Sequence, residues 1–119
     1  MNCGINSKLK KKLNKHSGDL VISSISLAEL MFGVENSKNK VRNLRNVLDF
    51  CCHVDVLFFD DKAAVEYGLL RAALHKKGKP IGPNDTLIAA HARSLDAILI
   101  TNNSREYKRV RGLRIENWI

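Results

Sequence analysis

Apolar residues follow two patterns along this chain, short unbroken runs and helical repeats. The unbroken runs predict strands at Leu20 to Ile22, Val54 to Phe59, Ala97 to Ile100 and Leu113 to Ile115. Between the runs, apolar residues three and four positions apart predict amphipathic helices, with polar residues on the opposite face. These helices are expected over residues 6–16, 26–34, 38–53, 60–74 and 85–95, with a loop or single turn at 104–107.

Strands that alternate with helices imply parallel pairing through right-handed crossovers. The expected fold class is therefore α/β, a three-layer sandwich with a central parallel sheet. Residues 1–119 contain no internal repeat and no low-complexity linker, so we expect one domain. In such sheets the functional site lies at the carboxyl ends of the strands.

Three acidic residues fall at or just beyond those strand ends. Glu29 follows the first strand, Asp85 opens a helix after a Pro/Gly turn at residues 80–84, and Glu106 follows the third strand. Carboxylates that converge without His or Cys ligands describe a site for a hard cation, Mg²⁺ or Mn²⁺. Such an ion can position and activate a water for attack on a phosphodiester. We therefore expect Glu29, Asp85 and Glu106 to be metal ligands and catalytic carboxylates.

Two of these acids, Glu29 and Asp85, also have a structural explanation. Ser26 and Glu29 have the spacing of a capping box, which would use the Glu29 carboxylate at the helix start. Asp85 is placed where it could cap its own helix, and Asp60-Asp61 is best explained as a helix cap. His91 lies on the apolar side of its predicted helix, which favours a packed histidine over a general base.

The charge of the chain favours an anionic partner. Lysine and arginine outnumber aspartate and glutamate by 20 to 12, which gives a net charge of +8 and a pI near 9.7. A basic surface attracts nucleic acid, although an acidic protein would respond to the same field. Arg105, Lys108 and Arg109 are candidate phosphate contacts, with a solvated surface role as the alternative. No helix-turn-helix pattern supports a DNA-binding regulator.

Composition excludes several other classes. No run approaches the roughly 18 apolar residues of a membrane span, and no secretory signal is visible, so we expect a cytoplasmic protein without membrane contact. Cys3, Cys51 and Cys52 lack the spacing of a zinc site and are expected to be buried free thiols.

Four stretches of the chain resemble PIN-domain ribonuclease toxins of the VapC type. They are Ser-Ser-Ile-Ser-Leu-Ala-Glu-Leu-Met-Phe-Gly at 23–33, Gly-Pro-Asn-Asp-Thr-Leu-Ile-Ala-Ala-His-Ala at 82–92, Thr-Asn-Asn-Ser-Arg-Glu-Tyr at 101–107 and Gly-Leu-Arg-Ile-Glu-Asn-Trp at 112–118. They occur in order and with spacings like those of the family, so the resemblance covers nearly the whole chain from about Leu20 onward.

The resemblance implies a Mg²⁺-dependent endoribonuclease of a type II toxin-antitoxin pair that acts on structured RNA, initiator tRNA among its substrates. It also implies a homodimer or higher oligomer and a cognate antitoxin that covers the active-site groove. Glu29, Asp85 and Glu106 match acids of the family's metal site. Asn103 stands where other members have Asp and could orient a water, and Thr101 and Asn84 are expected to support the ligands.

The beginning of the sequence departs from the family pattern. Family members open with an apolar strand that runs into an Asp ligand, whereas this chain begins Met-Asn-Cys-Gly-Ile-Asn. We therefore expect the first strand and its Asp to be missing, with activity lowered and open strand edges that pair with another chain. The alternative function is a catalytically defective toxin that acts as an antitoxin-binding or RNA-binding module.

Overall fold

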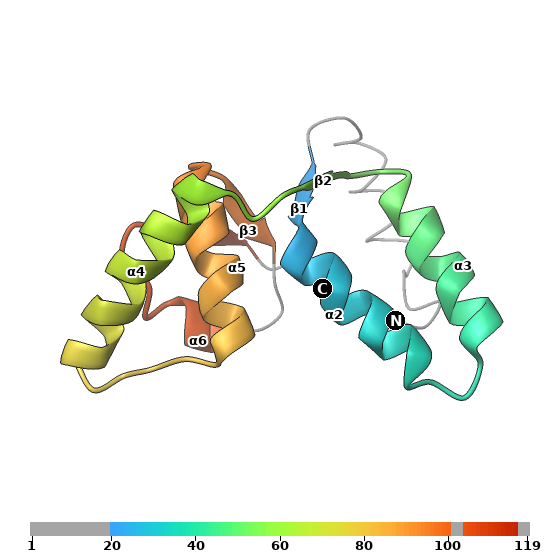
Figure 1. The fold of residues 1–119 in the computed structure, drawn as a ribbon, viewed down its shortest axis with the longest axis horizontal. Coiled ribbons are helices and arrows are strands. Elements are labelled where there is room, and N and C mark those ends of the chain that lie inside the picture. Colours follow the sequence, from blue (N-terminus) through green and yellow to red (C-terminus); the bar gives the residue numbers. More distant parts are fainter. Residues whose placement is uncertain (1–19, 101–103, 117–119) are drawn as a thin grey trace. The chain divides into compact units, whose positions relative to one another are not determined.

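The computed structural model describes residues 20–100 and 104–116 (Figure 1). The predicted helix at 6–16 and the residues Cys3, Thr101 and Asn103 lie outside this part of the chain. The chain divides into two compact units, residues 1–58 and 59–119, each described by itself below. The prediction of one domain over residues 1–119 stays a prediction.

The first unit pairs two short strands and two helices. Strand β1 (Val21–Ser23) runs parallel to β2 (Asp55–Leu57), with Val21 opposite Asp55 and Ser23 opposite Leu57. Between them in the chain lie α2 (Ser24–Glu35) and α3 (Lys40–Cys51), which pack against each other. Val34 of α2 and Val47 of α3 are buried.

The N-cap of α2 lies three residues earlier than the capping box predicts, and this rules out the capping box. The N-cap is Ser23, whose side-chain oxygen accepts a hydrogen bond from the Ile25 amide at 3.1 Å. Ser26 is therefore inside the helix. Glu29 lies in its second turn, where no free backbone amide is left for its carboxylate to cap. The capping role for Glu29 is wrong, and its exposed side chain remains available for another function.

The second unit contains the turn and the two acidic motifs. Its elements are α4 (Asp61–Lys76), α5 (Pro83–Ser94), β3 (Ile98–Ile100), α6 (Ser104–Tyr107) and β4 (Arg114–Glu116). The Asp60 carboxylate accepts a hydrogen bond from the Ala63 amide at 3.0 Å, which confirms the predicted cap of α4. Gly78 ends that helix with a positive φ of 66°, a conformation that glycine adopts without strain.

The core of the second unit lies between α4, α5 and the chain around α6. Leu70 and Leu74 of α4 pack with Ala89 and Ala90 of α5, and with Tyr107 at the end of α6. An ion pair also joins the two long helices: the Arg93 Nε donates to a Glu66 carboxylate oxygen at 2.6 Å. In Figure 1 α4 and α5 lie side by side, with β3 and α6 close to α5. This packing fixes the start of α5 relative to α6.

Over residues 20–100 and 104–116, the predicted element order and the parallel pairing are confirmed. Strands β3 and β4 are also parallel, with Leu99 opposite Ile115, so each unit has its own two-stranded parallel pair. The class is α/β, as expected. Within the described residues, no helix is both long enough and apolar enough to span a bilayer.

The expectation for the cysteines was only half right. Cys51 and Cys52 carry free thiols, as expected. Neither is fully buried, because Cys51 is half-buried and Cys52 is exposed where α3 ends. Burial, together with neighbouring Cys52, raises the pKa of the Cys51 thiol.

Candidate functional site

Asp85 lies in the first turn of α5, but it is not the helix cap. The N-cap is Gly82, which has no side chain to form a capping bond, and Pro83 occupies the first helical position. The Thr86 hydroxyl holds this turn by donating to the Gly82 carbonyl oxygen at 2.8 Å. The capping alternative for Asp85 is therefore wrong. Its carboxylate is half-buried and sits at the positive end of the helix dipole.

A tyrosine hydroxyl fixes the position of the Asp85 carboxylate. The Tyr107 hydroxyl donates to Asp85 Oδ1 at 2.8 Å, across 22 positions of sequence. Tyr107 is only 4% exposed and belongs to the core, so its ring has little freedom to move. The second oxygen, Oδ2, faces Gly82, where an added Cβ would lie 3.4 Å away. A side chain at this position would thus be in contact with the carboxylate.

Tyr107 is the functional residue that the sequence reasoning missed. It directly follows Glu106 in a stretch that carries the family resemblance, yet its role could not be read from the pattern. The aromatic ring of a tyrosine is commonly part of a core, and this one is buried. The available signal was its polar tip, because a buried hydroxyl nearly always has a hydrogen-bond partner.

The structure places the other predicted ligands on separate elements. Glu106 is half-buried in α6, next to Tyr107. Glu29 is exposed on α2 in the first unit. Within residues 20–100 and 104–116, no three His, Cys, Asp or Glu side chains group closely enough to hold a metal ion. The three-carboxylate site stays a prediction.

The donor chemistry of the second unit nevertheless suits a hard cation. Asp85 and Glu106 supply carboxylate oxygens, and hard divalent cations prefer oxygen ligands. Mg²⁺ is usually bound by one or two carboxylates and keeps several waters. These residues are therefore of the kind that binds Mg²⁺ or Mn²⁺.

The remaining predicted residues lie at the surface. Asn84 is exposed in the first turn of α5, and Arg105 and Lys108 are exposed around α6. Arg109 is exposed as well, and its guanidinium Nη1 donates to the Pro80 carbonyl oxygen at 3.1 Å. Arg109 thus ties the end of α6 to the turn before α5. Phosphate binding by these three basic residues stays a prediction.

His91 is a packed histidine, as predicted. It is 2% exposed, and its ring meets the Phe59 ring edge-on at a centroid distance of 5.5 Å. Burial lowers the pKa of His91, and the negative charge of Asp60 opposes this only in part. The neutral imidazole is thus the form that the fold favours.

Acid should therefore destabilise the protein through His91. Below about pH 6.5 the unfolded chain binds a proton on this side chain, while folded His91 stays neutral until its lowered pKa is reached. The unfolded state then binds more protons, so the free energy of unfolding falls as the pH drops below about 6.5. Urea unfolding at several pH values would measure this. His91→Gln should flatten the acid slope, and an unchanged slope would contradict the assignment.

The sequence matches a known family model and named relatives over most of its length. The family model described as PIN domain matches residues 5–113. A relative from Shigella flexneri, named tRNA(fMet)-specific endonuclease VapC, is 44% identical over 112 residues, which is 94% of this chain and 85% of the relative.

Solved structures of toxin-antitoxin complexes are also similar. DNA-bound VapBC from Salmonella typhimurium matches with a TM-score of 0.92 and 40% identity, over 98% of this chain and 88% of the other. VapBC2 from Rickettsia felis, bound to a promoter DNA fragment, has a TM-score of 0.90 and 40% identity, over 96% and 87% of the two chains. Both the sequence and the fold thus match the same group of proteins.

Proposed function

Because this chain belongs to the PIN-domain family, among the VapC-type ribonuclease toxins, we propose that it is an endoribonuclease that cuts initiator tRNA with the help of Mg²⁺ or Mn²⁺. The observation that carries the proposal is the Asp85 carboxylate, held by Tyr107 at the start of α5. The substrate follows from the relatives in Shigella flexneri and Salmonella typhimurium, both named tRNA(fMet)-specific endonuclease VapC.

Asp85 and Glu106 are the residues of the second unit that would hold the ion, and the ligand role of Glu29 stays a prediction from the sequence. When bound, such an ion activates a water for hydrolysis and neutralises charge on the phosphodiester. The Tyr107 hydroxyl bonds to one Asp85 oxygen and keeps the carboxylate in one orientation. The side chain would therefore lose little conformational entropy when it binds a cation. The exposed Arg105, Lys108 and Arg109 would bind phosphates of the RNA.

The overall charge supports a polyanionic substrate. A net charge of +8 attracts RNA over distances of about a Debye length, roughly 8 Å at physiological ionic strength. The Asp85 and Glu106 carboxylates repel an RNA phosphate unless a cation is bound between them and the phosphate. The net positive charge would thus attract the RNA, and the metal ion would let one of its phosphates approach the carboxylates. RNA should therefore bind without metal and be cut only with it.

The proposed partners are a cognate antitoxin and a second copy of the chain. The similar structures from Salmonella typhimurium and Rickettsia felis are VapBC complexes, which supports an antitoxin partner. Val65 and Leu69, 67% and 61% exposed one turn apart on α4, are candidate contacts for homodimerisation. We expect the protein to act in the cytoplasm, where tRNA is found.

The substrate proposal is tested by comparing two folded tRNAs. The purified chain, with Mg²⁺, is expected to cut initiator tRNA at least about tenfold faster than elongator methionine tRNA. A difference of about 1.4 kcal/mol in transition-state binding is enough for that ratio. Initial rates on both RNAs, read on denaturing gels, measure it. Equal rates would show that structured RNA in general is the substrate, and no cleavage of either would leave the alternative of a binding module.

A further inference from the structure

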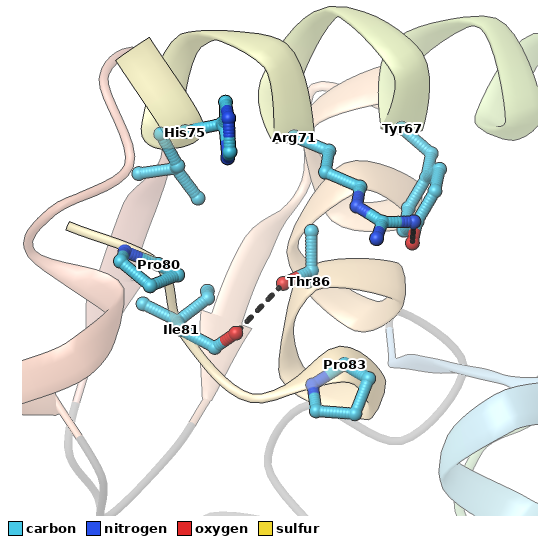
Figure 2. A pocket seen from close by; sticks show the side chains of 8 residues that line it. Tyr67, Arg71, His75, Pro80, Ile81, Pro83 and Thr86 are labelled. Carbon is cyan, nitrogen blue, oxygen red and sulfur yellow. Dashed lines mark hydrogen bonds between the residues drawn. The ribbon is translucent and has the colours of Figure 1, made fainter. Parts of the chain in front are cut away.

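A second site lies in the second unit, beside the turn that leads into α5. It is a cavity of about 280 Å³, lined by eight residues: Tyr67, Arg71, Leu74, His75, Pro80, Ile81, Pro83 and Thr86. Figure 2 shows Tyr67, Arg71 and His75 reaching from α4 on one side of the hollow, with Pro80, Ile81 and Pro83 along the turn. The reaction proposed above does not use this cavity.

The walls of the cavity suit a flat, apolar ring. Leu74 and Ile81 line it and are buried, and two prolines border it. The Tyr67 ring and the Arg71 guanidinium lie together, since Arg71 Nη1 donates to the Tyr67 hydroxyl at 3.1 Å and its Cζ is 5.9 Å from the ring centroid. Tyrosine rings and arginine planes are the two surfaces on which proteins stack unpaired nucleobases.

The size of the cavity limits what it can hold. Clefts that take drug-sized ligands measure about 300–1,000 Å³. A cavity of about 280 Å³ lies just below that range, which suits a single base better than a dinucleotide or a larger cofactor. The Thr86 hydroxyl bonds to the Gly82 and Ile81 carbonyl oxygens, so the turn that forms one wall is held in place before any ligand binds.

The charges around the cavity favour an anionic ligand. None of its eight lining residues is acidic, whereas Arg71 is positively charged and the His75 ring can donate a hydrogen bond. Lys76, Lys77 and Lys79 follow directly in the chain and are exposed. A base in the cavity would thus have cationic side chains near the phosphates on either side of it.

The cavity is also next to the proposed catalytic carboxylate. Thr86 lines the cavity, and Asp85 precedes it in the same turn of α5. An RNA strand that passes Asp85 would therefore have neighbouring nucleotides close to the cavity. The carboxylate and the cavity share one rigid segment, so binding at one would set the position of the RNA at the other.

We propose that this cavity binds one unpaired nucleobase of the RNA substrate, with the base stacked on Tyr67 and Arg71 and an adjacent phosphate near His75. The inference rests on the proposed ribonuclease function and identifies a substrate contact outside the metal site. Such a contact selects single-stranded loops, because a paired base cannot enter the cavity. It explains how a basic protein could place one loop of a folded RNA at Asp85.

The test separates RNA binding from the rate of cleavage. Arg71→Gln and Tyr67→Leu should each raise the KM for initiator tRNA roughly 5- to 100-fold, as expected for a lost base stack, with kcat little changed. Tyr67→Leu keeps an apolar side chain against the core. Lys62→Gln removes one exposed charge from the first turn of α4, away from the cavity, so it controls for general electrostatics. A KM equal to that of Lys62→Gln in both cavity variants would overturn the proposal.

A second measurement keeps this proposal distinct from the nuclease activity. Uridine monophosphate and adenosine monophosphate are added to the full-length protein without RNA. They should shift the amide NMR signals of Ile81 and Thr86 in the wild type and not in Tyr67→Leu. If the wild type cuts no RNA but shows these shifts, base binding in the cavity is supported and the nuclease proposal fails. If it cuts RNA but shows neither the shifts nor the KM change, the cavity proposal fails alone. Weakened antitoxin binding with an unchanged KM would assign the cavity to protein contact, which also overturns it.

Discussion

Replacing Asp85 with asparagine is expected to lower the kcat for RNA cleavage by about a thousandfold. Mutation of a residue that hydrogen-bonds to a metal ligand typically lowers metal affinity or activity about 10- to 100-fold. Loss of the ligand's own charge should lower the rate further. Asparagine keeps the size of the side chain, and its amide oxygen can still accept the Tyr107 hydroxyl hydrogen bond. The fold should therefore survive while the negative charge is lost. Single-turnover rates on initiator tRNA, with thermal unfolding as a check of folding, measure the effect.

Two further variants make this experiment specific. Asp61→Asn removes a carboxylate from the first turn of α4, the same position type in the same unit, and should leave the rate unchanged. Tyr107→Phe keeps the buried ring and removes only the hydroxyl that holds Asp85 Oδ1, so we expect a loss of about 10- to 100-fold. Retained cleavage in Asp85→Asn would point to another site or to a contaminating nuclease.

Element types along the described chain could be predicted from the sequence because local pattern decides them. Apolar runs and helical repeats identified the strands and the long helices in the correct order. The boundaries were less certain, and the start of α2 shows why. Ser23, Ser24 and Ser26 are all good capping residues, and the backbone uses Ser23. Choosing Ser26 then gave Glu29 a capping role that it does not have.

The sequence could predict the parts of the candidate site that depend on neighbouring residues in the chain, but not the contacts between distant residues. The turn before α5 identified Asp85 from sequence, since the Pro/Gly pattern marks a fixed helix start. The Tyr107 contact could not be found this way, because it joins residues 22 positions apart through the packing of α6 on the core. The cavity beside α4 was missed for the same reason. Tyr67 and Arg71 read as ordinary helix residues until the turn at Pro80 and Ile81 is placed opposite them.

Basic and acidic residues have separate roles in this chain, and the proposed activity needs both. The surface carries the excess of positive charge that attracts RNA, whereas Asp85 and Glu106 put negative charge at the proposed reaction site. Without a cation these carboxylates would repel the phosphate that must approach them. Metal dependence is therefore the property on which the proposal most directly depends.

Removal of divalent metal is expected to lower cleavage of initiator tRNA to background, a loss of about a thousandfold or more, while leaving RNA binding largely intact. EDTA followed by Mg²⁺ or Mn²⁺ should restore the rate, because both are hard cations that accept carboxylate ligands. Gel cleavage assays and fluorescence anisotropy with labelled RNA measure the two properties separately. Cleavage that persists in EDTA would exclude the proposed metal requirement.

Metal binding can also be measured without any RNA. Mg²⁺ at ten times its Kd should raise the free energy of unfolding by about 1.4 kcal/mol, because the ion binds the folded site and not the unfolded chain. Asp85→Asn should lose most of this stabilisation, and Asp61→Asn should keep it. If Mg²⁺ stabilises both variants equally, the ion binds elsewhere on the chain, and Asp85 would have to act on the RNA without it.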